Sequence, residues 1–364
     1  MNSSVLAYLE NSAEYFPEKC AVTDEKVSYS YSELVKLSSS VGTALSELIT
    51  SGDAVGIYME KCADAVAAFF ATVYAGGFYS VLNTELPQNR LQTTVSVLNP
   101  KVIVTSETAK EYFSERKIVT FEDLAKSEPD YAKLVEIRSH KIDTDPLYIN
   151  FTSGSTGTPK GIVVCHRSVI DFIDHFTEIF GIDNNDVIAN QAPFDFDVSV
   201  KDIYSAVKTG ATLVVVPRRM FSAPAELIDF ICDRRITVMI WAVSALCLIS
   251  TFHALDYRTP ETVNKILFSG EVMPLKALKN FRSHLPNAKY VNLYGPTEIT
   301  CNCTYHILDN DCDYADGIPI GKPFPNEDVI LLDENNNRIS EVGKVGEICV
   351  RGTALALGYY SNPE

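Results

Sequence analysis

Short β-branched runs alternate with helical segments along most of this chain, and this alternation most constrains its fold. Strands are expected over residues 55–59, 102–105, 147–151, 187–191, 212–216, 238–241, 266–268 and 290–293. Helices are expected over 62–75, 167–180, 199–209, 223–234, 244–252 and 275–285, and a capping-box pattern at 30–33 predicts one more helix that runs to about residue 48. Such alternation produces βαβ units, whose parallel sheets carry binding sites at the carboxyl ends of their strands. The sequence therefore predicts an α/β fold with mostly parallel sheets.

The pattern changes near residue 310. Strands are expected at 329–332, 346–352 and 354–360, with a turn at 335–337 and no helix between them. This arrangement is typical of a small antiparallel or barrel-like β subdomain. A chain of 364 residues exceeds one ordinary compact domain. We therefore expect two packed α/β subdomains, at about 1–185 and 186–310, followed by a β-rich subdomain at 311–364.

Composition disfavours several classes of partner. The chain has 31 basic and 47 acidic residues, a formal charge of −16, and no local basic patch that would attract a nucleic acid. No apolar run approaches the roughly 18 residues of a membrane span, and the N-terminus does not resemble a signal peptide. The nine scattered cysteines are typical of reduced thiols that act as small apolar residues. We expect a cytoplasmic protein without membrane insertion or nucleic-acid binding.

The first chemical motif is the glycine- and hydroxyl-rich segment at residues 151–161, which reads FTSGSTGTPKG. Its glycines allow the backbone to approach an anion, its hydroxyls and backbone N–H groups are neutral donors, and Lys160 adds a mobile positive charge. It is neither a Walker loop nor a dinucleotide-binding fingerprint. The motif indicates a phosphate-binding loop, and a plain surface loop is the alternative if it is considered alone.

The second motif, NLYGPTE at residues 292–298, follows the last strand expected in the α/β region. Its glycine–proline pair forces a turn that would present Tyr294, Thr297 and Glu298 at the edge of the sheet. An aromatic ring there can stack on a purine, a hydroxyl can bind a phosphate, and a carboxylate can hold Mg²⁺. A purely structural turn is the alternative for this segment by itself.

Together, the two motifs resemble the signature sequences of the adenylate-forming (AMP-binding) superfamily. That superfamily includes acyl-CoA synthetases, luciferases and the adenylation domains of nonribosomal peptide synthetases, and parts of the sequence also look like D-alanine–carrier-protein ligases. Further similarity follows in the same order, over essentially the whole chain, at residues 194–199, 268–271, 320–323, 346–350 and 358–360. The resemblance implies the large N-terminal domain of an amino-acid adenylation enzyme.

The resemblance also implies ATP and Mg²⁺ as cofactors. It assigns catalytic roles to Lys160 at the β- and γ-phosphates, Thr297 at the α-phosphate and Glu298 at the metal. The nucleotide would contact Thr152, Ser153, Gly154, Ser155, Thr156, Gly157, Lys160, Ser269, Gly270, Glu271, Asn292, Leu293, Tyr294, Gly295 and Thr297.

Asp197 is the most informative residue for the substrate, because its equivalent in members that activate α-amino acids pairs with the substrate ammonium. A helix N-cap is the alternative role for Asp197. Lys201 either points inward, where an acidic or polar substrate side chain would supply a partner, or extends outward and carries no information. Trp241 argues against a large aromatic substrate. The resemblance implies a substrate pocket lined by Asp197, Val198, Lys201, Trp241, Leu267, Ser269, Leu293, Cys301 and Asn302.

The reaction implied by the resemblance is ATP-dependent conversion of an amino acid to its aminoacyl-AMP, with release of pyrophosphate. The aminoacyl group would then pass to the phosphopantetheine thiol of a carrier protein. One alternative is an acyl- or aryl-CoA ligase, in which Asp197 would be structural, and another is a catalytically silent nucleotide-binding scaffold. Complete members continue into a ribose-binding aspartate, a hinge and a small domain with a catalytic lysine. We therefore expect a truncated large domain with little or no activity of its own.

Overall fold

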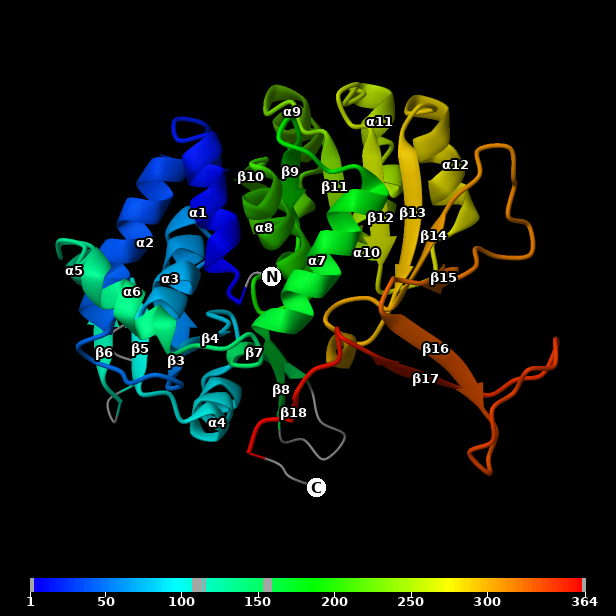
Figure 1. The fold of residues 1–364 in the computed structure, drawn as a ribbon. Helices are drawn as coiled ribbons and strands as arrows, with labels where there is room; N and C mark the ends of the chain where they lie inside the picture. The colour runs from blue at the N-terminus through cyan, green and yellow to red at the C-terminus, as the bar shows by residue number, and fades with distance from the viewer. Residues whose placement is uncertain (1–2, 107–112, 114–115, 153–158, 362–364) are drawn as a thin grey trace.

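The computed structural model describes residues 3–106, 113, 116–152 and 159–361 (Figure 1). A seven-stranded sheet runs in the order β18-β8-β7-β4-β3-β5-β6. Its strands β3 to β7 pair in parallel, and β8 adds antiparallel pairs with β7 and β18. The strand bounds are β3 Ala54–Tyr58, β4 Phe78–Val81, β5 Val102–Thr105, β6 Ile118–Thr120, β7 Pro146–Thr152, β8 Lys160–Cys165 and β18 Gly358–Tyr359.

A second, nine-stranded sheet has the order β15-β14-β13-β12-β11-β9-β10-β1-β2. Its central strands are parallel, whereas β2, β14 and β15 pair antiparallel at the two edges. Because β1 pairs with β10, this sheet contains strands from both ends of the α/β region, and the proposed subdomain boundaries stay a prediction. The bounds are β1 Cys20–Thr23, β2 Ser28–Ser30, β9 Val187–Asn190, β10 Thr212–Val215, β11 Val238–Ala242, β12 Lys265–Ser269, β13 Lys289–Tyr294, β14 Thr304–Ile307 and β15 Lys322–Pro323.

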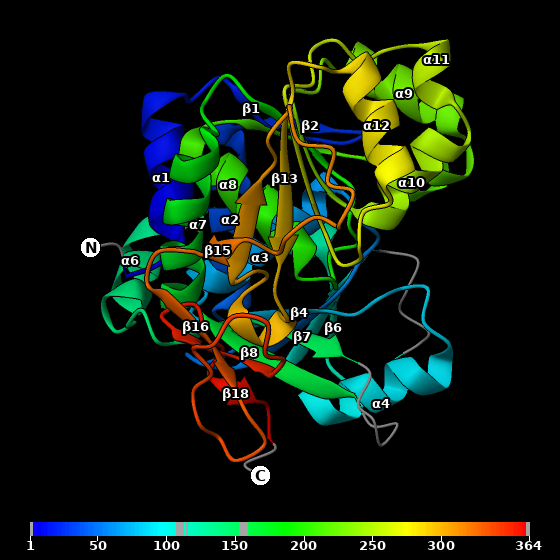
Figure 2. The same cartoon turned by 90° about the vertical axis from the view of Figure 1, so that its right-hand side faces the viewer.

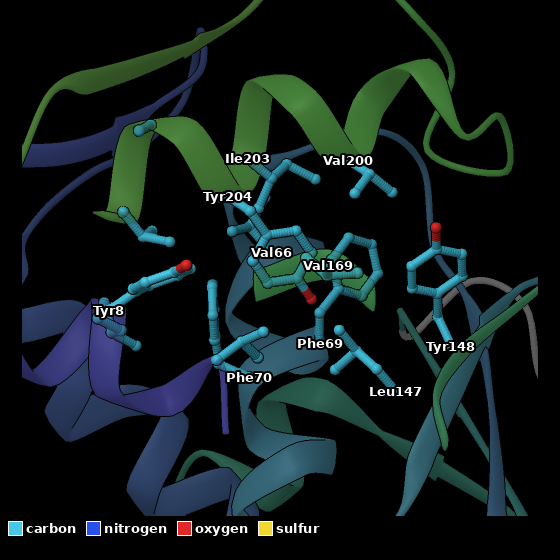
Figure 3. Packing of buried hydrophobic residues seen from close by; sticks show 14 of the residues in the cluster. Tyr8, Val66, Phe69, Phe70, Leu147, Tyr148, Val169, Val200, Ile203 and Tyr204 are labelled. Atoms are coloured by element: carbon cyan, nitrogen blue, oxygen red, sulfur yellow. The ribbon is translucent and has the colours of Figure 1, made fainter. Parts of the chain in front are cut away.

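One group of helices lies between the two sheets and shares a continuous apolar core with both. In Figure 3, side chains of the third and eighth helices meet there, and the ring centroids of Phe70 and Tyr204 are 5.9 Å apart. Burial of these apolar faces is the main force that holds the layers together. The helices of this layer are α1 Leu6–Tyr15, α2 Tyr31–Leu45, α3 Ala63–Tyr74, α7 His166–Phe180 and α8 Val198–Thr209, and α5 Phe121–Leu124 and α6 Tyr131–Ser139 pack against α2.

Other helices cover the outer faces of the sheets. A separate apolar cluster packs α9, α10, α11 and α12 against the nine-stranded sheet, and Figure 2 shows this group on the far side of β13 from α7 and α8. The fourth helix covers the seven-stranded sheet. No helix of the described residues is long and apolar enough to span a bilayer. The bounds are α4 Gln88–Leu98, α9 Pro224–Asp233, α10 Val243–Thr251, α11 Ala254–Tyr257 and α12 Leu275–His284.

In the described part of the last fifty residues, the structure forms the antiparallel alternative expected from the sequence and not the barrel-like one. Strands β16 (Glu327–Leu332) and β17 (Glu347–Gly352) form an antiparallel hairpin that projects from the body of the molecule (Figure 1). Within the expected strand at 354–360, only the short strand β18 near its end forms, and it pairs with β8 of the seven-stranded sheet. The described residues form no closed barrel, because the third strand satisfies its backbone hydrogen bonds elsewhere.

Candidate active site

The candidate active site lies at the carboxyl edge of the nine-stranded sheet. Strands β11, β12 and β13 are parallel neighbours, so the segments that follow them meet at one edge. Ser269 ends β12 and is buried, whereas Tyr294 ends β13 with 38% of its surface exposed. Both lie in segments whose sequence motifs predict nucleotide binding.

The turn after β13 brings the second motif against the residues that follow it. A Cβ atom at Gly295 would lie 2.5 Å from the Cα atom of Asn302, so only glycine allows this close approach. Thr300 and Cys301 adopt left-handed backbone conformations, with φ of 50° and 76°. This tight return places the predicted substrate-binding residues Cys301 and Asn302 beside the glycine–proline turn.

Asp197 occupies the N-cap position of α8, but its side chain makes no capping hydrogen bond. Its carboxylate interacts with the Thr297 side chain, which joins the segment before α8 to the turn after β13, and with the backbone N–H of Val198. Burial raises the pKa of the Asp197 carboxyl above its ordinary value, and the Thr297 hydrogen bond and the charge of Lys201 oppose that rise. The thiol of Cys301 also donates to the Asp197 backbone carbonyl, with a sulfur–oxygen distance of 3.0 Å.

Lys201 points inward, one helical turn beyond Asp197. The residue is 0% exposed, and its Nζ donates to Asn302 Oδ1 at 2.7 Å and to Ser269 Oγ at 3.4 Å. Burial lowers the pKa of this amine, while interactions with Cys301, Asp197 and Asp202 oppose that effect. The predicted substrate residues Lys201, Ser269 and Asn302 therefore form one connected group.

Two further ionisable residues, the buried Asp202 and the partly buried Lys61, lie near this group and were not singled out from the sequence. Asp202 is 0% exposed, and its Oδ2 accepts a hydrogen bond from Asn190 Nδ2 at 2.7 Å. Lys61 Nζ donates to the backbone carbonyls of Asn190 and Gln191 at 3.1 and 3.0 Å. Burial raises the pKa of Asp202 to about 8 and lowers that of Lys61 to about 7.

We call Asp197, Lys201, Asp202 and Lys61 the inner charge cluster. Its signal in the sequence was the adjacent pair Lys201-Asp202 inside a helical segment with apolar residues on both sides. Charged residues at such positions are costly to bury unless they have partners. The hydrogen-bond partners of these charged residues come from other helices and strands. The sequence alone therefore did not show which residues compensate the buried charges.

The second group is partly exposed, because Lys160 and Glu298 are half-buried and Tyr359 is exposed. The Tyr359 hydroxyl donates to Glu298 Oε1 at 2.8 Å, and Lys160 Nζ lies 5.3 Å from the centre of the Tyr359 ring. The hydrogen bond to Glu298 raises the pKa of Tyr359. Lys160 itself is paired with Thr152 across the β7–β8 hairpin. We call Lys160, Tyr359 and Glu298 the outer rim, which connects the two predicted nucleotide motifs through a residue that was not assigned a role from the sequence.

Trp241 does not lie with the other predicted substrate residues. It belongs to the core on the outer face of the nine-stranded sheet, where its Nε1 donates to the carbonyl of Ala189 at 2.8 Å. Leu267 and Leu293 belong to the core on the inner face. Successive residues of a strand point to opposite faces, so Ile240, which pairs with Leu267, shares their face instead. The expectation that Trp241 limits the size of the substrate therefore loses its basis.

The remaining predicted residues lie around the edge. Val198 begins α8 and is half-buried, and Asn292 Nδ2 donates to the Pro319 carbonyl at 2.9 Å. Gly270 has φ of 93°, and a Cβ atom at this position would meet no atom within 4 Å, while Glu271 is exposed. The predicted loop residues Ser153, Gly154, Ser155, Thr156 and Gly157 lie outside the described residues.

The donor set at this edge fits a magnesium nucleotide. The Glu298 carboxylate and the Thr297 hydroxyl are oxygen ligands of the kind that Mg²⁺ prefers. The open space beside Gly270 and the exposed ring of Tyr294 provide room and a stacking surface for a base. The site thus offers separate places for a cation, a base and an ammonium group.

The family model described as AMP-binding enzyme matches residues 9–360. The hybrid PKS-NRPS synthetase apdA of Emericella nidulans is 29% identical over 358 residues, which cover 96% of this chain and 9% of that protein. The L-proline–[L-prolyl-carrier protein] ligase of Pseudomonas fluorescens is 28% identical over 360 residues, covering 96% of this chain and 72% of the ligase. The AMPPNP-bound structure of the nonribosomal peptide synthetase FmoA3 is 25% identical with a TM-score of 0.87, covering 100% of this chain and 39% of FmoA3. The chain therefore belongs to the AMP-binding enzyme family.

Proposed function

We propose that this chain takes part in the ATP-dependent activation of an amino acid as its aminoacyl-AMP, with release of pyrophosphate. The observation that carries the proposal is the contact between Asp197 and Thr297, because it connects a carboxylate suited to an ammonium group with the motif expected to hold the α-phosphate. Membership of the AMP-binding family supports the nucleotide chemistry. A relative whose name describes the loading of L-proline onto a carrier protein supports an amino-acid substrate.

In this proposal, Asp197 receives the substrate ammonium, and their attraction is strengthened because the carboxylate is partly shielded from water. The substrate carboxylate attacks the α-phosphorus atom in line, and pyrophosphate leaves with the electron pair of the broken P–O bond. Thr297 binds the α-phosphate, and Lys160 neutralises charge on the leaving phosphates. Positioning and charge neutralisation carry the step, without a covalent enzyme intermediate.

Glu298 would hold Mg²⁺, which neutralises negative charge on the phosphate oxygens when it is bound. In the described structure, its carboxylate accepts a hydrogen bond from the Tyr359 hydroxyl, so this tyrosine orients the predicted metal ligand. We also propose a carrier-protein phosphopantetheine thiol as the acceptor and a cytoplasmic location. These two proposals rest on the named relatives and on the composition of the chain.

Thermal unfolding of the purified chain with non-hydrolysable analogues tests the proposal. An aminoacyl-AMP analogue at a hundred times its dissociation constant should add about 2.7 kcal/mol of stability. Asp197→Ala should abolish this effect. Asp195→Ala is the matched control, because Asp195 lies in the same segment but accepts its hydrogen bond from Asn83. Stabilisation by acyl-AMP analogues alone would favour a CoA ligase, and no stabilisation by any analogue would contradict the proposal.

A further inference from the structure

The observation that leads beyond amino-acid activation in general is the environment of Lys201. This lysine is fully buried at the carboxyl edge of the sheet, and its two hydrogen-bond acceptors, Asn302 and Ser269, are neutral. No ion pair within 4.0 Å among the described residues includes Lys201. An ammonium group has three donors, so one N–H and the positive charge lack a direct partner.

A buried ammonium without a carboxylate partner is unfavourable. The carboxylates of Asp197 and Asp202 attract Lys201 through space, but each has another hydrogen-bond partner. Asp202 accepts a hydrogen bond from Asn190 at Oδ2, its Oδ1 has no hydrogen-bond partner among the described residues, and Asp197 interacts with Thr297. The arrangement stabilises Lys201 only in part, and an incoming anion would complete it.

The spacing of the charges on α8 indicates what kind of anion would fit. Asp197 and Lys201 are four positions apart, so they lie on one face of the helix, about 6 Å apart along its axis. A negative group and a positive group at this spacing complement a molecule whose ammonium and carboxylate are joined by a short carbon chain. The bond from Lys201 to Ser269 is the longer of its two hydrogen bonds, and the flexible lysine side chain can exchange it for a stronger acceptor.

We propose that the substrate is an α-amino acid whose side chain ends in a carboxylate, with its ammonium at Asp197 and its side-chain carboxylate at Lys201. This inference rests on the proposed function. The α-carboxylate of the substrate stays free for the reaction with ATP. Asn302 orients the Lys201 ammonium through the 2.7 Å hydrogen bond, and is a positioning residue for the same selection.

Matched pairs of ligands test the charge preference without any change to the protein. Isothermal titration of the purified chain compares non-hydrolysable aspartyl- and asparaginyl-adenylate analogues, and likewise glutamyl and glutaminyl analogues. The two members of each pair differ in charge but have nearly the same shape. We expect the acidic member of at least one pair to bind about 10- to 100-fold more tightly, as a hydrogen bond between two charged groups predicts. Equal or tighter binding of the neutral member in both pairs would overturn the inference.

Lys201→Met keeps the length of the side chain and removes its charge, so this variant should lose or reverse the preference. The control is Lys208→Met, because Lys208 lies on the same helix but pairs with Asp174 at 2.8 Å outside the site. If Lys201→Met does not fold, the paired ligands on the unchanged chain still decide the question.

These measurements distinguish an error in the substrate class from an error in the proposed function. If aminoacyl analogues bind and require Asp197 but show no charge preference, only the assignment of the substrate class is wrong. If no aminoacyl analogue binds the unchanged chain, the proposed function is wrong, and the substrate class is wrong with it.

Discussion

The inner charge cluster and the outer rim both bring charged residues of distant segments together, but in different surroundings. Lys201 and Asp202 are each 0% exposed and bonded to specific partners. In the outer rim, the contact between Tyr359 and Glu298 is exposed to solvent. Water screens charges at the rim, whereas a buried charge depends almost wholly on the protein groups around it.

This difference separates two tasks of one site. The inner charge cluster can discriminate between substrates, because a wrong partner leaves a buried charge uncompensated. The outer rim can exchange its contacts for phosphate oxygens and a cation, because its side chains are already partly solvated and cost less to rearrange. We therefore expect substitutions in the inner charge cluster to affect stability and specificity strongly, and substitutions in the outer rim to affect mainly nucleotide binding.

The largest effect on stability is expected for Asn190→Ala. This change removes the donor to Asp202 Oδ2 and leaves a fully buried carboxylate without its hydrogen bond. It should lower the free energy of unfolding by about 3 kcal/mol, measured by urea denaturation. Asn337→Ala, in the exposed turn of the hairpin, should cost less than about 0.5 kcal/mol. Similar decreases in the free energy of unfolding in both variants would show that burial does not make the hydrogen bonds of the inner charge cluster more important for stability.

The second prediction concerns pH and Lys61. The folded pKa of Lys61 is about 7, below its ordinary value of 10.5. As pH rises from 7 to 10.5, the unfolded chain loses this proton whereas the folded chain has already lost it, so folding becomes more favourable. The full shift from 10.5 to about 7 would give about 4 kcal/mol relative to Lys61→Met, and solvent screening of the partly buried amine reduces the expected gain to about 2 kcal/mol across this window. Urea denaturation at several pH values measures the difference, and a constant difference at all pH values would exclude the depressed pKa.

Thr297→Val tests the connection between the two regions. The variant keeps the shape of the side chain but loses the hydroxyl that bonds to Asp197. We expect about tenfold weaker binding of an aminoacyl-AMP analogue, since a hydrogen bond to a charged group is lost. Isothermal titration provides the measurement, with Thr304→Val as a control, because the buried Thr304 hydroxyl has no partner among the described residues. Unchanged affinity in Thr297→Val would remove the main support for the proposed function.

The smallest effect on stability is expected for Tyr359→Phe in the outer rim. The change removes the exposed hydrogen bond to Glu298 and keeps the aromatic ring near Lys160. The free energy of unfolding should change by less than about 0.5 kcal/mol, as is usual for exposed polar contacts. A loss of several kcal/mol in thermal or urea unfolding would contradict the contrast between the rim and the inner charge cluster.

Local sequence patterns predicted much of the fold. The expected strands at 102–105 and 212–216 correspond to β5 and β10, and the expected capping box is present between Ser30 and Glu33 at the start of α2. These features depend on neighbouring residues, so they can be recognised without knowledge of the rest of the chain. The strand β1 was not anticipated, because a strand this short is stabilised by its pairing with β10, far away in sequence.

What the sequence determined by itself was the alternation of strands and helices, the two glycine-containing motifs and the resemblance to a family. Only the tertiary structure decided that Lys201 points inward, that Trp241 lies on the opposite face from Leu267, and that Tyr359 meets Glu298. The physical reason is that periodicity and turns are local properties, whereas the partner of a side chain depends on how each helix is rotated against its sheet and which strands become neighbours. The chemistry of the site therefore depends on residues that lie far apart in the sequence and that only the packing of the layers brings together.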